Sequence, residues 1–296
     1  MKEKIAFWVS QRHNIPYKFR KSFVKYAYPK ILSDYSFEIN FYGLKYSGNT
    51  KDSTDRFFFM FGGYEKYMLR FMQGYCSAAK SGEFVFLDVG AHVGNHSLFM
   101  SQYATHIHAF EPNPLARESL NSKIYNNDIK NITVHPIGLS NENNKLPFYI
   151  SQNDNIAEAS FRQDHDKNNQ YYNDLEVKIG DEIIFQRQIE KVDLIKIDVE
   201  GYERQVIEGL NKTIEKDRPT IILELSVTTR KSFTSRNDFE SIFPKDYIFY
   251  KFSGVTIEKS RYKLTGFEYD KNIDDIEIVA VPVEKRIFLK NKVKKT

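Results

Sequence analysis

The sequence predicts an α/β fold in which a mostly parallel sheet is covered by helices on both faces. From residue 83 onward, short apolar stretches alternate with stretches of helical character. This order is typical of parallel strands joined by helices. In addition, the first apolar stretch, residues 84–89, leads directly into a small-residue turn that opens a helix. That handover from strand to helix is typical of folds that bind nucleotide-like ligands.

Each element follows from a local pattern. We expect parallel strands at residues 84–89, 106–111, 132–137, 192–199 and 220–225. A helix should begin near Gly94, and Pro114 can open another at its first turn, where a missing N–H costs nothing. The polar stretch 141–190 is expected to hold a short strand pair, 146–150 with 176–179, and a loop. Two later strands, 247–253 and 276–283, should form an antiparallel hairpin at the sheet edge.

The first 80 residues differ from this alternating region. They are basic, aromatic and, we expect, irregular, because Pro16 and Pro29 interrupt them. Residues 36–42 could form an antiparallel strand, and residues 43–54 are polar and rich in turn formers. Residues 64–72 have apolar side chains at the spacing of one helix face. We therefore expect three parts: a basic aromatic cap (1–80), a main domain (81–283) and a basic tail (284–296).

Composition sets broad limits on the kind of protein. The chain has 296 residues, of which 41% are hydrophobic and 15% aromatic, enough for a substantial core. A single cysteine, Cys76, excludes an internal disulfide and a cysteine-based zinc site. No secretion signal is evident, and no apolar run approaches the roughly 20 residues that cross a bilayer. These features predict a cytoplasmic protein.

The net charge of +4 is distributed unevenly. Residues 1–30 carry +7 and residues 284–296 carry +5, which leaves −8 for the middle of the chain. The basic ends could contact an anionic membrane surface or an anionic glycan. The alternative is that they are simply solvated. No motif for base readout is present, so we do not expect a nucleic-acid partner.

The turn after the first strand indicates the kind of ligand. Asp88 ends that strand, and Glu111 ends the next one 23 positions later, close to the spacing expected for a ribose-binding acid. In the turn, His92 stands where a dinucleotide site has its middle glycine, and it would crowd a pyrophosphate that Asp88 would also repel. S-adenosylmethionine carries an ammonium and a sulfonium and no phosphate. The charge argument therefore favours this donor over NAD, and an ordinary strand end remains the alternative.

A second acidic segment follows at the fourth strand. Asp198 and Glu200 should open at the same sheet edge as Asp88 and Glu111, because ligands bind outside the carboxyl ends of parallel strands. Crowded carboxylates repel one another unless a positive group is present. The cationic donor or Lys196 could supply it. A metal ion is the less favoured alternative, and we expect none.

Five segments, taken in order, resemble a known family. They are Asp88–Asn95, Phe110–Pro114, Pro136–Ser140, Ile195–Glu203 and Arg218–Glu224. Together they resemble the FkbM family of S-adenosylmethionine-dependent methyltransferases over about residues 55–230. The resemblance implies a class I methyltransferase (Rossmann-like) sheet and methyl transfer, commonly to hydroxyls of sugars or secondary metabolites. His92 departs from the asparagine usual in the family. The segment ending in Glu65 resembles one that often closes over the donor.

The candidate site residues combine these arguments. The expected donor contacts are Glu65, Asp88, Gly90, Ala91, Gly94, Asn95, Glu111, Pro112, Asn113, Gly138 and Asp198. Glu111 should accept both ribose hydroxyls, and Asn113 should flank the adenine. Asp198 and Glu200 are the first candidates for the base that removes an acceptor proton, with His92 and His96 as weaker ones. Ser160, Glu200 and Glu224 are the expected acceptor contacts.

The leading functional hypothesis is an O-methyltransferase acting on a carbohydrate hydroxyl, in a cell-surface glycan or a glycolipid. Two enzymatic alternatives remain open: N-methylation of a peptide side-chain amide and O-methylation of a secondary metabolite. A non-catalytic binding module is disfavoured because Asp88, Gly90, Glu111 and Asp198 are all intact. The sequence makes no prediction of oligomeric state.

Overall fold

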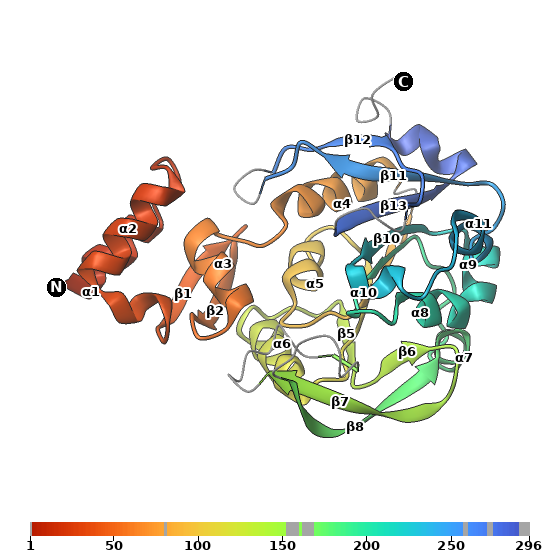
Figure 1. Ribbon diagram of the computed structural model, residues 1–296, viewed down its shortest axis with the longest axis horizontal. Helices are drawn as coiled ribbons and strands as arrows, with labels where there is room; N and C mark the ends of the chain where they lie inside the picture. Colours follow the sequence, from red (N-terminus) through yellow and green to blue (C-terminus); the bar gives the residue numbers. More distant parts are fainter. Residues whose placement is uncertain are drawn as a thin grey trace.

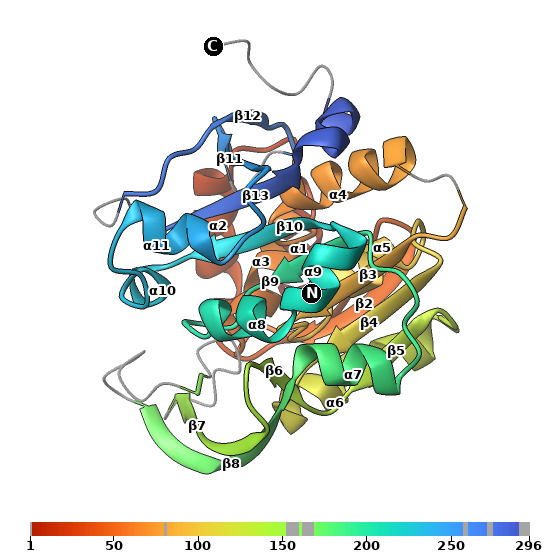
Figure 2. The ribbon, with the colours of Figure 1, turned by 90° about the vertical axis from the view of Figure 1, so that its right-hand side faces the viewer.

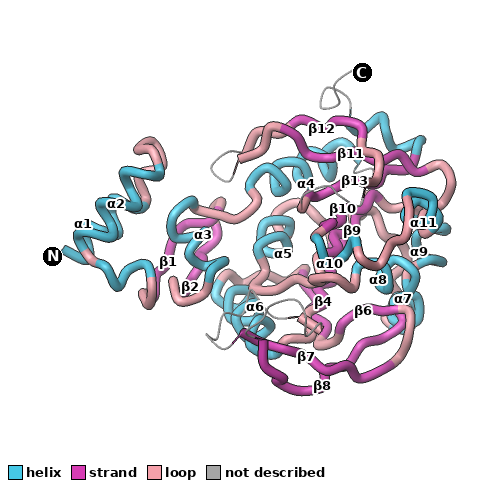
Figure 3. Tube along the Cα trace, in the orientation of Figure 1, coloured by secondary structure: helices cyan, strands magenta, loops and turns pink. Residues whose placement is uncertain are grey.

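The computed structural model describes residues 2–79, 82–151, 160–161, 169–256, 260–270 and 275–289. Its centre is an eight-stranded sheet with the order β12-β11-β13-β10-β9-β3-β4-β5 (Figures 1 and 3). From β10 to β5 all neighbouring strands are parallel, and β13, β11 and β12 are antiparallel to their neighbours. The mostly parallel α/β fold expected from the sequence is therefore confirmed.

The sheet strands are β3 (Val85–Val89), β4 (His106–Phe110), β5 (Ile132–His135), β9 (Leu194–Ile197), β10 (Thr220–Leu225), β11 (Tyr247–Ser253), β12 (Lys263–Gly266) and β13 (Ile276–Pro282). The helices that precede, connect and follow these strands are α4 (Lys66–Ala79), α5 (Asn95–Met100), α6 (Pro114–Asn126), α7 (Gly180–Gln186), α8 (Glu203–Gly209), α9 (Asn211–Asp217), α10 (Val227–Arg230), α11 (Arg236–Ser241) and the 3-10 helix η3 (Val283–Leu289). Pro114 opens α6 as predicted, and Asn113 caps that helix by accepting from the Leu115 backbone N–H.

Both faces of the central sheet are buried, which explains why its strands are continuously apolar. Alternate residues of β3 point to opposite sides: Phe86 packs with one core and Leu87 with the other. The first core also contains apolar residues of α4, α5 and α6, and the second contains those of α7, α8, α9 and α11. Figure 2 shows α7, α8 and α9 in front of the sheet, and Figure 1 shows α4 on the opposite side of the strands from them.

The N-terminal segment is more regular than predicted. Instead of irregular chain, residues 2–32 form α1 (Lys2–Ser10), α2 (Tyr17–Ala27) and the 3-10 helix η1 (Pro29–Leu32). The two prolines do not break helices. Pro16 is the residue before α2, and Pro29 is the first residue of η1, where proline is tolerated. In Figure 1 the pair α1 and α2 lies at the end of the molecule farthest from the large sheet.

The rest of the predicted cap connects this pair to the sheet. The expected strand is β1 (Ser36–Phe41), and the stretch predicted as turns contains its antiparallel partner, β2 (Leu44–Asn49). A helix that was not predicted, α3 (Ser53–Phe61), follows and is capped by the Asp52 side chain. Its aromatic residues join the same apolar core as the β3 and β4 side chains.

Two of the predicted strand pairs are present, and each has an additional strand beside it. The expected strand pair is present as β7 (Asn144–Ser151) and β8 (Asn169–Ile179), and β8 also pairs with β6 (Gly138–Ser140) in a separate three-stranded sheet. At the other edge, β11 and β13 pair as predicted, but β12 adds a further strand and takes the edge position. Most of the predicted loop within 141–190 lies outside the described residues.

Candidate active site

The turn after β3 is held in place by the two neighbouring strands. The Gly90 and Ala91 backbone N–H groups both donate to the Phe110 carbonyl oxygen, at 3.0 and 3.1 Å. Gly90 has φ +82°, and a Cβ built there would lie 1.9 Å from the Asp198 carbonyl oxygen. Only glycine therefore fits where the turn after β3 lies against the end of its parallel neighbour β9.

Asp88 and Gly94 flank this turn, Asp88 in β3 before it and Gly94 just before α5. Asp88 is fully buried and accepts a 2.6 Å hydrogen bond from the Ser97 hydroxyl on α5, which fixes the start of that helix. Gly94 precedes α5 with φ +94°, a left-handed conformation that favours glycine. Neither residue is among the described residues that line the cavity above the turn. Both residues hold the turn in its position.

Glu111 follows β4 and is oriented by backbone donors. Its two carboxylate oxygens accept from the His92 N–H at 2.7 Å and the Asn113 N–H at 2.8 Å. It is only 6% exposed. Burial raises its pKa to about 7, although both backbone hydrogen bonds act in the opposite direction. The carboxylate is thus preorganised at the cavity wall before any ligand arrives.

Asp198 follows β9 and pairs with a buried cation. Its Oδ2 lies 2.8 Å from Nζ of Lys196, which is 3% exposed. Burial alone would raise the pKa of Asp198, but the Lys196 ammonium holds it below the usual value. Asp198 is therefore a fixed negative charge near neutral pH rather than a group that readily takes up a proton.

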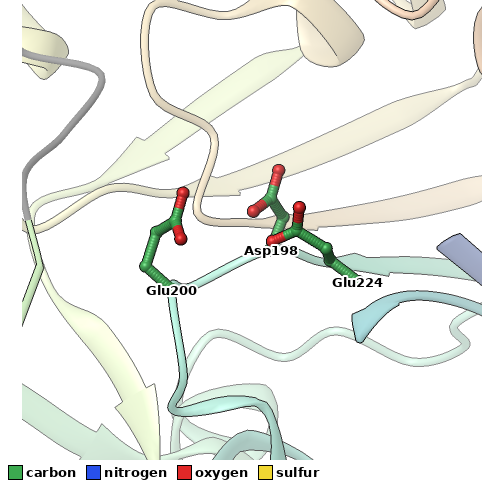
Figure 4. A group of neighbouring side chains, drawn as sticks. All are labelled: Asp198, Glu200 and Glu224. Carbon is green, nitrogen blue, oxygen red and sulfur yellow. The ribbon is translucent and has the colours of Figure 1, made fainter. Parts of the chain in front are cut away.

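Glu200 and Glu224 lie beside Asp198 at the sheet edge (Figure 4). Burial and the Asp198 charge raise the pKa of Glu200 to about 8, and the same causes raise that of Glu224 well above its usual range. Glu200 also has φ +53°, an uncommon conformation for a residue other than glycine. One carboxylate oxygen from each of the three lies within 4.8 Å of the others, so this is the group in the described residues with the spacing to hold a metal ion.

A second polar group lies on the α5 side of the site. Glu65 precedes α4 and approaches His96, with Oε2 and Nε2 3.2 Å apart. Burial lowers the pKa of His96 to about 3 and raises that of Glu65 to about 7, so the imidazole is neutral near pH 7. Asn95 Nδ2 donates to the Tyr64 carbonyl oxygen at 3.1 Å, which ties the segment before α4 to the start of α5.

These elements enclose a cavity of about 270 Å³. Twelve of the predicted site residues line it: Gly90, Ala91, His92, Asn95, His96, Glu111, Pro112, Asn113, Gly138, Ser160, Asp198 and Glu200. Among the described residues, four predicted ones do not line it: Glu65, Asp88, Gly94 and Glu224. Ser160 donates to the Glu200 carbonyl oxygen at 3.2 Å and so contacts the loop that carries Glu200.

The aromatic wall of the cavity was not predicted from the sequence. Its rings come from four separate parts of the chain: Phe57, Tyr64, Phe110, Phe148, Phe161 and Tyr202. Phe161 makes edge contacts with the rings of Phe148 and Tyr202, at centroid distances of 5.0 and 5.7 Å. The high aromatic content signalled such a surface, but no sequence spacing links these positions. Ser53 and Thr54 at the start of α3 also line the cavity.

Comparison with known proteins identifies the class and the family. The profile described as the methyltransferase FkbM domain matches residues 88–245, which include the glycine turn, Glu111, Asp198 and Glu200. This match defines the class of the chain, which carries a methyltransferase domain over these residues. The chain belongs to the FkbM methyltransferase family, and the sequence resemblance to that family is confirmed.

A curated relative is the hexuronic acid methyltransferase AglP of Haloferax volcanii, which is 29% identical over 133 residues. The match covers 44% of this chain and 52% of AglP, so the chain spans about half the length of this relative.

Solved structures are more distant. The crystal structure of a methyltransferase FkbM from Methylobacillus flagellatus has a TM-score of 0.44 and 15% identity, covering 94% of this chain and 58% of that one. The tRNA (uracil-54, C5)-methyltransferase of Pyrococcus abyssi, in complex with S-adenosyl-L-homocysteine, has a TM-score of 0.42 and 12% identity. It covers 84% of this chain and 44% of that one.

The polar side chains that line the cavity fit S-adenosylmethionine. Buried Oδ1 of Asn95 and Nε2 of His92 have no hydrogen-bond partner among the described residues, and both side chains line the cavity. Buried polar atoms in a native protein are nearly always paired, so these two indicate that a ligand supplies the partners. The carboxylates of Glu111 and Asp198 add acceptors suited to hydroxyls and to positive charge.

Proposed function

We propose that this chain transfers a methyl group from S-adenosylmethionine to a hydroxyl of a carbohydrate. The observation that supports this reaction is the place of Glu200, whose carboxyl group lines the cavity beside Asp198 and has a pKa raised to about 8 by burial and the Asp198 charge. A hydroxyl acceptor must lose its proton as the new bond forms, and a base with a pKa near the working pH serves this step best. Asp198 is a poorer base because Lys196 holds its pKa below the usual value.

In this proposal the donor is bound by residues after β3, β4 and β9. When bound, it supplies a methyl group on a positively charged sulfur, which is already a good leaving group. We propose that Glu111 accepts the ribose hydroxyls and that Pro112 and Asn113 border the adenine. Asp198, Asn95 and His92 then face the amino acid part of the donor. The main contribution of the protein is alignment, which can lower such a barrier by roughly 7–11 kcal/mol.

The acceptor is proposed to be a sugar on two grounds. Phe148, Phe161 and Tyr202 give the cavity an aromatic wall, and flat rings suit the apolar face of a sugar. The relative AglP is named as a hexuronic acid methyltransferase, and its match extends over about half of its length.

We further propose that the reacting sugar is neutral. Among the described residues that line the cavity, Glu111, Asp198 and Glu200 are acidic, and Lys196 is bonded to Asp198. A uronic acid carboxylate beside the ionised Asp198 would be repelled. Neutral glycosides should therefore be methylated faster than the matching uronic acids.

The test uses the purified chain, S-adenosylmethionine and paired neutral and acidic glycans. Release of S-adenosylhomocysteine and product mass spectrometry report the reaction. Glu200→Gln should lower kcat by roughly 10²–10⁴-fold, as expected for loss of a general base, and should leave the affinity for S-adenosylhomocysteine unchanged. Glu142→Gln, at an exposed position, is the control. A fully active Glu200→Gln variant, or methylated peptide amides as the product, would overturn the proposal.

We also propose that the protein acts in the cytoplasm. Cys76 is buried and forms no disulfide, which suits a reducing compartment. Localisation of a fluorescently tagged chain tests this.

A further inference from the structure

The helix pair α1 and α2 exposes an unusual amount of apolar surface. Fourteen large apolar side chains are exposed in the described part of the chain, and five of them belong to this pair: Ile5, Trp8, Phe19, Phe23 and Tyr26. Phe19 is 71% exposed and Tyr26 is 90% exposed. Such a concentration on two short helices calls for a binding partner, because large apolar patches on soluble proteins mark interaction sites.

On α2 these side chains form a separate stripe. Phe19, Phe23 and Tyr26 are spaced i, i+4 and i+7, so at about 100° per residue they fall within roughly 60° of the helix circumference. The helix packs against the protein through other positions: Val24 is 0% exposed and Arg20 is 2% exposed. The exposed stripe is therefore not the packing face.

Positive charge lies along one side of the stripe. Lys18, Lys21 and Lys25 are exposed on α2, and Lys2 and Lys4 are exposed on α1. The one acid in the first thirty residues, Glu3, makes a side-chain hydrogen bond to Tyr35. Lys18 and Lys25 lie about a quarter turn from the aromatic stripe, which is close enough for their long side chains to reach the same surface.

We propose that α1 and α2 dock on the surface of an anionic lipid bilayer. The aromatic stripe enters the boundary between headgroups and acyl chains, and the lysines contact anionic headgroups. This combination of an apolar stripe with flanking lysines is typical of helices that lie in the membrane interface, and aromatic rings favour that depth. No helix in the described ranges is long and apolar enough to cross a membrane. The helices therefore lie on the surface.

Charge complementarity decides among possible partners. A nucleic acid would be bound by the lysines but would leave the Phe19, Phe23 and Tyr26 stripe in water. An anionic soluble glycan would do the same. A bilayer with anionic headgroups satisfies both the apolar and the basic parts of this surface. The proposal is independent of the acceptor, because it concerns binding by α1 and α2 alone.

The only tryptophan of the chain provides a direct probe. Trp8 is 55% exposed on α1, with the Arg12 guanidinium 4.1 Å from its ring centroid. The intact protein is mixed with vesicles of phosphatidylcholine, with or without phosphatidylglycerol. We expect a blue shift of the Trp8 emission, and quenching by brominated lipid, with the anionic vesicles only.

Matched variants assign the contact to this surface. Phe19→Ser with Phe23→Ser should abolish vesicle sedimentation, while Phe185→Ser, at an 84% exposed position on α7, should not change it. Lys18→Ala with Lys25→Ala should weaken binding roughly 30-fold at low salt, because each lysine near an anionic surface contributes about fivefold. Lys212→Ala, at an exposed position on α9, is the charge control.

Several results would overturn the proposal. One is equal binding to neutral and anionic vesicles, and another is binding without a change in Trp8 emission. Retention on an anionic polysaccharide or RNA without vesicle binding would assign the surface to a different partner. No binding to any vesicle would also reject the proposal. Circular dichroism and thermal melts of each variant separate these outcomes from misfolding.

Discussion

The affinity for S-adenosylhomocysteine should fall as the pH drops below 7, because Glu111 then becomes protonated. The Glu111 pKa is raised to about 7 by burial. To accept two ribose hydroxyls the carboxyl must be ionised, so below that pH binding has to release a proton. At about pH 5, two units below the pKa, this costs about 2.7 kcal/mol, which is a roughly 100-fold weaker Kd than at about pH 8.

Isothermal titration at several pH values measures this effect. S-adenosylhomocysteine is the better ligand because its sulfur is uncharged, which removes changes in attraction between a sulfonium and the other acids. His96 does not titrate in this range, since its pKa is about 3. Repeating the titrations in buffers of different ionisation enthalpy counts the released protons directly.

The variant Glu111→Gln tests whether Glu111 causes the pH dependence of the Kd. It should bind roughly 100-fold more weakly at about pH 8, since a hydrogen bond to a charged group is worth about 1.5–3 kcal/mol, and its Kd should depend on pH much less than that of the wild type. Glu118→Gln, an exposed position on α6, should behave like the wild type. If Glu111→Gln keeps the pH dependence, or if the wild-type Kd is flat, the role given to Glu111 is wrong.

Two further predictions concern stability. Gly90→Ala should lower the free energy of unfolding by about 3 kcal/mol or more, because its Cβ would lie 1.9 Å from the Asp198 carbonyl oxygen. Gly74→Ala in α4, where a Cβ meets no neighbour within 4 Å, should be neutral or stabilising; urea denaturation compares the two, and equal effects would contradict the argument. Asp198→Asn should cost about 3 kcal/mol because it leaves the Lys196 charge buried beside a neutral partner. Adding Lys196→Met should restore much of this loss in the same assay, and no recovery would show that the pair is not the cause.

The parallel sheet was predicted well because both of its faces are buried. Continuous apolar runs such as β9 and β10 are typical of strands covered on both sides, and their carboxyl ends necessarily meet at one edge. Glu111 and Asp198 could therefore be placed at one site although 87 positions separate them. The structure brings both to the cavity wall.

The N-terminal region was predicted less well, for identifiable reasons. Pro16 and Pro29 were interpreted as interruptions, whereas each stands next to or at the start of a helix. In α3, the run from Phe57 to Phe61 is apolar at every position, so it lacks the periodicity of a half-exposed helix. The contribution of Phe57 to the cavity wall depends on tertiary packing, which no local pattern encodes.

The position of β13 has a consequence for the biogenesis of the protein. Residues 276–282 are made after those of β11 and β12, yet they occupy the place between β10 and β11. During synthesis, β10 has an open flank until residues 276–282 have left the ribosome, and an unpaired flank is a template for mispairing with other chains. A nascent chain that stalls before Ile276 would contain all the parallel strands, but β11 and β12 would have no β13 to pair with. Such a chain is a natural substrate for chaperones.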